Sequence, residues 1–263
     1  MERLGRMDVT DSYKNDRYHR QTSLEAIGID GQQRLRQARV LVVGAGGLGS
    51  PLIEYLAAAG VGTIGIVEDD TVSASNLNRQ ILYYPSQEGK PKANCAADVV
   101  RRMNPDCNVQ AYRMRLTDSN ASDLFGKYDV IADCTDNLAT RYVIDRHTKA
   151  LGIPFVHGSL CEFEGLVAVF NYKGSTSYED LFPFDADEIA GFTQPTGILG
   201  AFAGVVGTIE ALETVKVILG KPTLADRILL IDGLSLRFET IKTSAGVAQV
   251  TAFSASARQV DRS

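Results

Sequence analysis

The sequence predicts an α/β fold: a single domain on a Rossmann-like, doubly wound sheet that is mainly parallel and is continued by antiparallel strands. Over residues 38–152, β-branched runs alternate with segments of helical periodicity. This order is typical of parallel strands that are covered by helices on both faces. The first run leads into a glycine-rich turn, and after residue 152 two strand-like runs are joined by a short turn.

The first half of the chain supplies the alternating elements. "ARVLVVG" (38–44) is a β-branched run that ends in glycine, and "PLIEYLAAAG" (51–60) has helical spacing with a glycine stop. "KPKANCAADVVRRMNP" (90–105) has proline near its start and an Asn-Pro exit, which indicates a helix. The same criteria predict helices at 24–37 and 141–152 and strands at 61–69, 108–114 and 128–137.

The second half of the chain has a different pattern. Residues 173–196 are rich in Gly, Ser, Asp and Pro with little periodicity, which predicts a functional or mobile loop. The long apolar helix expected at 198–220 contains Glu210, Glu213 and Lys216, which favours a core or interface helix over a membrane span. Strands are expected at 153–160, 164–172, 227–233, 237–242 and 248–253.

Composition excludes several classes of function. The net charge of −5 and the pI near 5.3 argue against a broad nucleic-acid-binding surface. No apolar run approaches the roughly 20 residues of a membrane span, and the polar N-terminus lacks a signal-peptide core, so we expect a cytoplasmic protein. The 4 cysteines form no C-x-x-C pair, which leaves no visible zinc ribbon or redox motif.

A glycine motif predicts a nucleotide site. Gly44, Gly46 and Gly49 form G-x-G-x-x-G between a strand and a helix, where the backbone approaches a phosphate and the helix N-terminus favours its charge. Glu68, at the end of the next strand, is suited to accept ribose hydroxyls. Alone, these residues indicate an adenine nucleotide, most commonly NAD, with a ligand-free glycine turn as the alternative.

A group of amides and cations changes that interpretation. Asn76, Arg79 and Gln80 occur together in "SASNLNRQ", and Lys92 and Arg20 add positive charge. Cleavage of a triphosphate at the α-phosphate needs cations that stabilise the pentacoordinate centre and the leaving pyrophosphate. A dehydrogenase has no such need, so the cluster favours ATP.

Asp136 follows a predicted strand, at the sheet edge where ligands bind in doubly wound folds. It is either a helix cap or, beside a triphosphate, a magnesium ligand. The sequence contains no Ser-His-Asp or paired-carboxylate pattern. The predicted chemistry therefore depends on positioning and electrostatics.

Together these motifs carry a family resemblance. "RYHRQ", "GAGGLGSP", "DDTVSASNLNRQ", "GKPKA", "DCTDN" and "GILGAFAGVVGTIEALETVK" resemble, in order and over residues 17–242, the MoeB/ThiF/HesA family of sulfur-carrier-protein adenylyltransferases, relatives of ubiquitin-activating enzymes. The resemblance implies ATP, Mg²⁺ and a homodimer. The implied substrate is the C-terminal Gly-Gly of a small ubiquitin-like sulfur carrier protein, in thiamine, molybdopterin or related sulfur transfer. The implied products are an acyl-adenylate, for later thiocarboxylate formation, and pyrophosphate.

The resemblance also implies roles for single residues. Arg79, Lys92 and Asp136 would be catalytic, Asp136 would bind magnesium, and Arg20 would reach into the neighbouring subunit's site. Glu68 departs from the family's usual aspartate, but its longer carboxylate can still accept a ribose hydrogen bond. The implied nucleotide-binding residues are Gly44, Gly46, Gly47, Gly49, Glu68, Asp70, Ser75, Asn76, Arg79, Gln80, Lys92, Asp136 and Asn137.

The implied domain covers residues 17–253, between a flexible lead (1–16) and a C-terminal tail (254–263). Its nucleotide-binding half is expected at about 38–152 and its carrier-binding half at about 153–253.

The chain lacks thiols that most relatives possess. In most relatives two C-x-x-C pairs bind one zinc, but here the corresponding positions are Ser177, Asp180, Ser254 and Ala257. Because only the aspartate among them is a competent ligand, we expect no zinc site. Many relatives also have a loop cysteine where this chain has Thr193, so we expect an external sulfur donor, with Cys161 the remaining thiol of interest.

Three other functions stay open at this stage. The enzyme could adenylate a different carboxylate, such as a peptide C-terminus or an RNA-linked acid. It could be a non-catalytic partner subunit of a heterodimer, although such subunits usually lose the arginine–lysine–aspartate set that this chain retains. An NAD-dependent oxidoreductase is the least favoured.

Overall fold

The structure is a computed structural model that describes residues 17–191 and 197–245. The predicted lead (1–16), the strand at 248–253 and the tail (254–263) lie outside the described residues, as do Thr193, Ser254 and Ala257.

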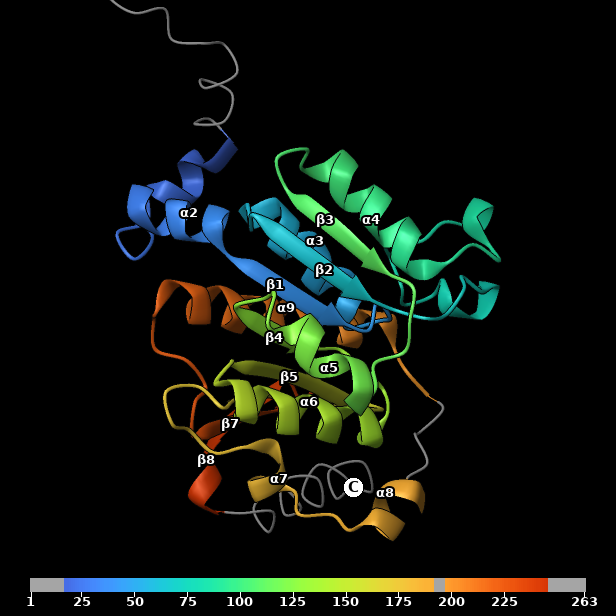
Figure 1. The fold of residues 1–263 in the computed structure, drawn as a ribbon, viewed down its shortest axis with the longest axis vertical. Coiled ribbons are helices and arrows are strands. Elements are labelled where there is room, and N and C mark those ends of the chain that lie inside the picture. Colours follow the sequence, from blue (N-terminus) through green and yellow to red (C-terminus); the bar gives the residue numbers. More distant parts are fainter. Residues whose placement is uncertain (1–16, 192–196, 246–263) are drawn as a thin grey trace, which may run out of the picture.

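The described residues form an eight-stranded sheet in the order β3-β2-β1-β4-β5-β6-β7-β8 (Figure 1). The first five strands in this order are parallel, and β6, β7 and β8 continue the sheet in antiparallel pairs. The predicted fold class is therefore confirmed. The strands are β1 (Arg39–Val43), β2 (Thr63–Val67), β3 (Asn108–Tyr112), β4 (Val130–Asp133), β5 (Phe155–Cys161), β6 (Glu164–Phe170), β7 (Arg227–Asp232) and β8 (Arg237–Lys242).

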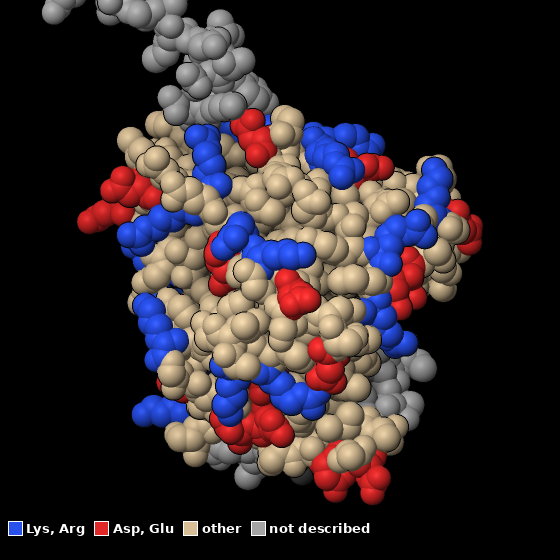
Figure 2. Space-filling model, in the orientation of Figure 1, with Lys and Arg blue, Asp and Glu red and all other residues tan. Residues whose placement is uncertain are grey.

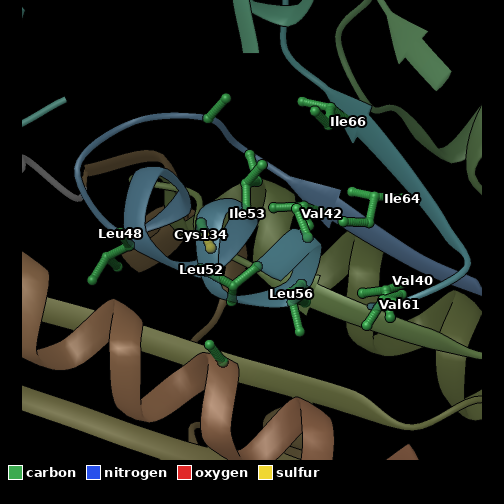
Figure 3. Packing of buried hydrophobic residues seen from close by; sticks show 14 of the residues in the cluster. Val40, Val42, Leu48, Leu52, Ile53, Leu56, Val61, Ile64, Ile66 and Cys134 are labelled. Carbon is green, nitrogen blue, oxygen red and sulfur yellow. The ribbon is translucent and has the colours of Figure 1, made fainter. Parts of the chain in front are cut away.

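Helices cover both faces of the sheet. One hydrophobic cluster joins a sheet face to α2 (Gly28–Gln37), α3 (Gly49–Ala59), α4 (Lys92–Met103) and α9 (Gly200–Leu219). In that cluster Leu52, Ile53 and Leu56 of α3 lie over Val42 and Ile64 (Figure 3). A second cluster joins the opposite face to α5 (Asp118–Phe125), α6 (Leu138–Leu151) and the short α7 (Tyr178–Leu181). Alternate residues of strands β1 to β7 thus belong to the two hydrophobic clusters.

Several element boundaries differ from the prediction. The sequence analysis did not predict α5, although Thr117 and Asn120 form a capping box at its start. Residues 173–196 were expected to lack regular structure but contain α7 and α8 (Ala186–Gly191). Strand β4 ends at Asp133 and not at 137, so residues 134–137 form a loop that leads directly into α6. Residues 17–22 form a separate helical segment before α2.

Surface properties agree with the composition. Among the described helices, none combines the length and apolarity needed to cross a membrane. Figure 2 shows Lys and Arg side chains interspersed with Asp and Glu over the face that it draws. That face therefore presents no continuous basic surface in the described part of the chain.

Candidate active site

A cavity of about 290 Å³ lies at the carboxyl ends of the parallel strands. This is the edge at which doubly wound sheets bind ligands. Most of the predicted site residues line it: Gly44, Gly46, Gly47, Glu68, Asp70, Arg79, Gln80, Lys92, Asp136 and Asn137. The second half of the chain contributes Ser159, Leu160, Ile198 and Ala203.

The glycine motif forms the turn between β1 and α3 by close backbone packing. Gly44 has a φ of 93°, and a β-carbon on it would lie 2.7 Å from the Cys134 carbonyl oxygen. A β-carbon on Gly49 would lie 2.2 Å from the Gly44 carbonyl oxygen, so neither position has room for a side chain. The buried Tyr83 hydroxyl donates to the Ala45 carbonyl oxygen at 2.7 Å and supports the turn from behind.

Glu68 is bound to the glycine turn. Its Oε2 accepts a hydrogen bond from the Ala45 amide at 3.0 Å, and its Oε1 accepts from the Asp70 amide at 3.0 Å. The longer carboxylate is therefore held at both oxygens by backbone donors. Each oxygen keeps further acceptor capacity, so the ribose role stays a prediction.

Two of the predicted cations, Lys92 and Arg79, line the cavity and bind acceptors of their own chain. Lys92, at the start of α4, is 4% exposed, and its Nζ lies 3.1 Å from Asp70 Oδ2. Arg79 Nη1 donates to the Ser75 carbonyl oxygen at 2.9 Å and to Asn78 Oδ1 at 3.0 Å. Both side chains are therefore held beside the cavity by acceptors on the strand-to-helix connection.

Gln80 carries an unsatisfied acceptor. The residue is 5% exposed, and its Oε1 has no hydrogen-bond partner among the described residues. A buried acceptor without a partner costs about 1–3 kcal/mol. Because Gln80 also lines the cavity, the unmet hydrogen bond indicates a ligand or an ordered water at this wall.

Asp136 lies in the loop between β4 and α6. It is exposed, lines the cavity and makes no hydrogen bond or ion pair with other described residues. The helix cap that was the alternative role for Asp136 belongs to its neighbour: Asn137 Oδ1 accepts from the Thr140 amide at 2.9 Å. Asp136 is thus left available to a ligand.

Four predicted residues do not line the cavity. Gly49 shapes the turn, Ser75 supplies its carbonyl to Arg79, and Asn76 lies within the short helix Ala74–Asn76. Arg20 lies in the helical segment whose Tyr18 packs against Gly60, at the far end of α3 from the cavity. Figure 1 shows the arrowheads of β1 to β3 pointing away from this end.

The sequence analysis missed one buried cation at the site. Arg141, in the first turn of α6, lines the cavity and is 8% exposed. Its Nη2 donates to the Thr135 carbonyl oxygen at 3.2 Å, and its Nε lies 4.0 Å from Asp133 Oδ2. The only sequence signal was its place five residues after Asp136, which does not separate it from a surface arginine.

Arg141 belongs to a buried ionisable group. Asp133 Oδ2 accepts from His157 Nδ1 at 2.8 Å. Burial would raise the pKa of Asp133, but the hydrogen bond from His157 and the charge of Arg141 outweigh it and lower that pKa. Burial lowers the pKa of His157, so we assign a neutral imidazole that donates to an ionised Asp133.

A buried carboxyl group, that of Glu210, lies next to this cluster. Glu210 of α9 is fully buried, and its two carboxyl oxygens lie 3.4 and 3.5 Å from Cys134 Sγ. Burial raises the pKa of Glu210 well above its ordinary value, and the nearby negative charge of Asp133 adds to the shift. The pKa of Cys134 is raised by burial in the same way, so burial favours the uncharged form of both groups.

The two described positions that correspond to zinc cysteines have another role. Ser177 caps α7, accepting from the Asp180 amide at 3.2 Å, and Asp180 completes the capping box. Lys149 Nζ lies 3.2 Å from Ser177 Oγ and 3.4 Å from Asp180 Oδ2. The buried carboxylate of Asp145 accepts from the amides of Tyr178 and of Glu179 at 2.9 and 3.0 Å. Hydrogen bonds thus hold this segment against α6.

Comparison with known proteins identifies a matching family model and similar sequences. A model of the ThiF family matches residues 18–250. A sulfur carrier protein adenylyltransferase of Thermus thermophilus is 43% identical over 234 residues, 86% of this chain and 86% of that protein. A probable adenylyltransferase/sulfurtransferase MoeZ of Mycobacterium tuberculosis is 42% identical over 231 residues, 86% of this chain but 59% of that protein. The chain thus spans less than two thirds of the latter relative.

Solved structures show the same fold. A crystal structure of PaaA matches with a TM-score of 0.75 and 22% identity, over 92% of this chain and 77% of that one. Escherichia coli MccB with ATP matches with a TM-score of 0.75 and 18% identity, over 88% of this chain and 72% of that one.

Proposed function

The chain belongs to the ThiF family, and from this premise we propose that it adenylates the C-terminal carboxylate of a small ubiquitin-like sulfur carrier protein, with ATP as the second substrate. The single observation that carries the proposal is one cavity that combines the glycine turn, Arg79, Lys92 and Asp136. The curated relative from Thermus thermophilus bears the name of this activity.

The reaction exchanges one bond at phosphorus. A carboxylate oxygen of the carrier attacks the α-phosphorus of ATP, the bond from that phosphorus to the bridging oxygen breaks, and pyrophosphate leaves. The product is a mixed anhydride of the carrier and AMP. No proton is transferred because the carboxylate is already ionised, so Lys92 and Arg79 contribute by stabilising charge on the phosphates.

Asp136 fits a divalent cation by its chemistry. It presents an exposed carboxylate without a competing partner among the described residues, next to the cavity. Magnesium is commonly held by one or two carboxylates together with substrate phosphates and water. We propose that Asp136 holds Mg²⁺, which would neutralise phosphate charge when bound.

We also propose that sulfur comes from an external donor. Burial raises the pKa of Cys95 and Cys134 and raises that of Cys107 to about 11. Such thiols are poor nucleophiles at neutral pH. Cys161, at the end of β5, is the one cysteine that is not buried. Experiments that trap covalent adducts should therefore examine Cys161 first.

A homodimer would complete the site. Arg20 lies at the far end of α3 from its own cavity, so it could act only on a neighbouring copy. Exposed apolar side chains on α3 and α9 provide a candidate contact surface: Tyr55, Val205 and Leu212 are 57%, 41% and 56% exposed. Arg20→Ala should impair activity, and mixing it with Asp136→Ala should restore partial activity through one intact site in a mixed dimer. No restoration would argue against action of Arg20 in trans.

The test of function is ATP–pyrophosphate exchange with Mg²⁺ and purified carriers that end in Gly-Gly. Lys92→Ala, Arg79→Ala and Asp136→Ala should each reduce exchange by at least about 100-fold, as expected when one such electrostatic group is lost. Lys90→Ala is the matched control, because Lys90 is exposed and does not line the cavity. Exchange with a peptide or small carboxylate but no carrier would favour the alternative substrate. ATP binding without exchange for any carboxylate would favour a non-catalytic subunit.

A further inference from the structure

Asp136 has no partner of its own, yet both of its neighbours in the chain are anchored. On one side, the Thr135 amide and hydroxyl both donate to Asp133 Oδ1, at 2.9 and 2.6 Å. On the other side, Asn137 caps α6. Hydrogen bonds of Thr135 and Asn137 therefore hold the loop in place on both sides of Asp136.

Arg141 completes the hydrogen bonds of Thr135. Its Nη2 binds the Thr135 carbonyl oxygen, so all three polar groups of Thr135 (amide, hydroxyl and carbonyl) are satisfied by Asp133 and Arg141. Asp133 is fully buried, and its second oxygen is held by His157. These buried hydrogen bonds restrict Thr135 to one conformation, because each alternative would leave its amide, hydroxyl or carbonyl unpaired.

Two details argue against a merely structural ion pair. Arg141 Nε is 4.0 Å from Asp133 and has no hydrogen-bond partner among the described residues, so the pair is not the bidentate contact that maximises stability. The well-formed contact of Arg141 is instead its bond to Thr135, directly beside Asp136.

We propose that Arg141 is a positioning residue: together with Asp133 it fixes Thr135 and thereby holds the Asp136 carboxylate at the cavity, where the metal and the triphosphate would bind. This inference rests on the proposed function. Loss of a group that orients a metal ligand typically costs 10–100-fold in metal affinity or activity. We therefore expect Arg141→Lys, which keeps the buried positive charge but loses the guanidinium geometry, to lose about 10-fold in each.

The test combines metal binding with a double-mutant cycle. Mn²⁺ affinity in the presence of a non-hydrolysable ATP analogue, followed by electron paramagnetic resonance, should fall about 10-fold in Arg141→Lys. Exchange activity should fall similarly, and Arg141→Lys should cost little more in an Asp136→Asn background, because residues that act as a unit are not additive. Thr135→Val provides a second variant that removes only the hydroxyl bond and should shift Mn²⁺ affinity in the same direction.

Arg39→Lys is the matched control. Arg39 pairs with Asp129 at 2.7 Å, and it starts β1, at the opposite end from the cavity. It should leave Mn²⁺ affinity unchanged. Unchanged Mn²⁺ affinity in folded Arg141→Lys and Thr135→Val, or losses that multiply in the double variant, would overturn the inference while the proposed function stands. Full exchange in Asp136→Asn would instead refute the proposed role of Asp136, and the inference with it.

Discussion

Glu210 makes the stability of this protein depend on pH in a way that one substitution should reveal. Its carboxyl group is fully buried between α9 and the sheet, touches Cys134, and lies close enough to Gly158 that a β-carbon there would be 2.4 Å from Glu210 Oε2. Burial, followed by the negative charge of Asp133, raises its folded-state pKa well above the ordinary value. In the unfolded chain the pKa returns to about 4.3.

The sign follows from proton counting. Between the unfolded and the raised folded pKa, the folded protein holds a proton that the unfolded chain has released. Folding stability from this group is therefore complete below about pH 4.3 and falls by about 1.4 kcal/mol per pH unit as pH rises toward the folded pKa. Glu210→Gln, which has similar volume and no charge, removes this dependence.

The assay is urea unfolding of both proteins at pH 5, 6, 7 and 8. The difference in unfolding free energy, variant minus wild type, should grow with pH by up to about 1.4 kcal/mol per pH unit until the pH reaches the folded-state pKa of Glu210. Other titrating groups contribute equally to both proteins and cancel. Glu25→Gln, on an exposed residue, should give parallel curves. Parallel curves for Glu210→Gln as well would show that Glu210 is ionised in the fold and would refute the reasoning.

The remaining predictions concern the glycine turn, the α7 segment and Asp70. Gly49→Ala should lower the free energy of unfolding by about 1–3 kcal/mol, because its β-carbon would lie 2.2 Å from a backbone oxygen. Gly47→Ala, whose β-carbon would meet Ala203 at 3.4 Å, should change that free energy by less than about 0.5 kcal/mol. Equal effects of the two variants in chemical denaturation would contradict this prediction. Ser177→Ala should cost about 0.5–2 kcal/mol by removing the α7 cap. Metal analysis should find no stoichiometric zinc, and a chelator should leave the melting temperature unchanged; one zinc per chain would disprove the expectation. Asp70→Asn should change ATP affinity less than about 5-fold in calorimetry, because the Asp70 side chain that pairs with Lys92 is 70% exposed.

The site residues that follow the ends of parallel strands could be predicted from the sequence. The glycine turn, Glu68 and Asp136 each follow a β-branched run, and parallel strands bring their carboxyl ends to one edge. The convergence of these residues on one cavity could therefore be predicted without a structure. The antiparallel continuation of the sheet was also predicted, because a short turn joins the two strand-like runs after residue 152.

The missed features depend on tertiary packing. Arg141 looks like any helix arginine until β4 and β5 place Asp133 and His157 beneath it. Helix α5 is short and has few apolar residues, so its periodicity is weak, and its capping box was the only strong local signal. Arg20 could be linked to the site by resemblance, but its distance from the cavity depends on how Tyr18 packs on Gly60.

Lys92 and Arg79 line the cavity and already have hydrogen-bond acceptors in their own chain without a ligand. Lys92 is paired with Asp70, and Arg79 is bound to Ser75 and Asn78. In the proposed reaction a triphosphate would replace these partners, and Asp70 can give up its contact at little cost because its side chain is 70% exposed. Asp133 and Arg141 differ: they are buried, and breaking their contact would leave an uncompensated charge. In the proposed reaction the ligand would thus exchange the partners of Lys92 and Arg79, while the Asp136 loop keeps its position. A fixed Asp136 loop would favour in-line attack at one phosphorus, because that reaction depends on the positioning of the reacting groups.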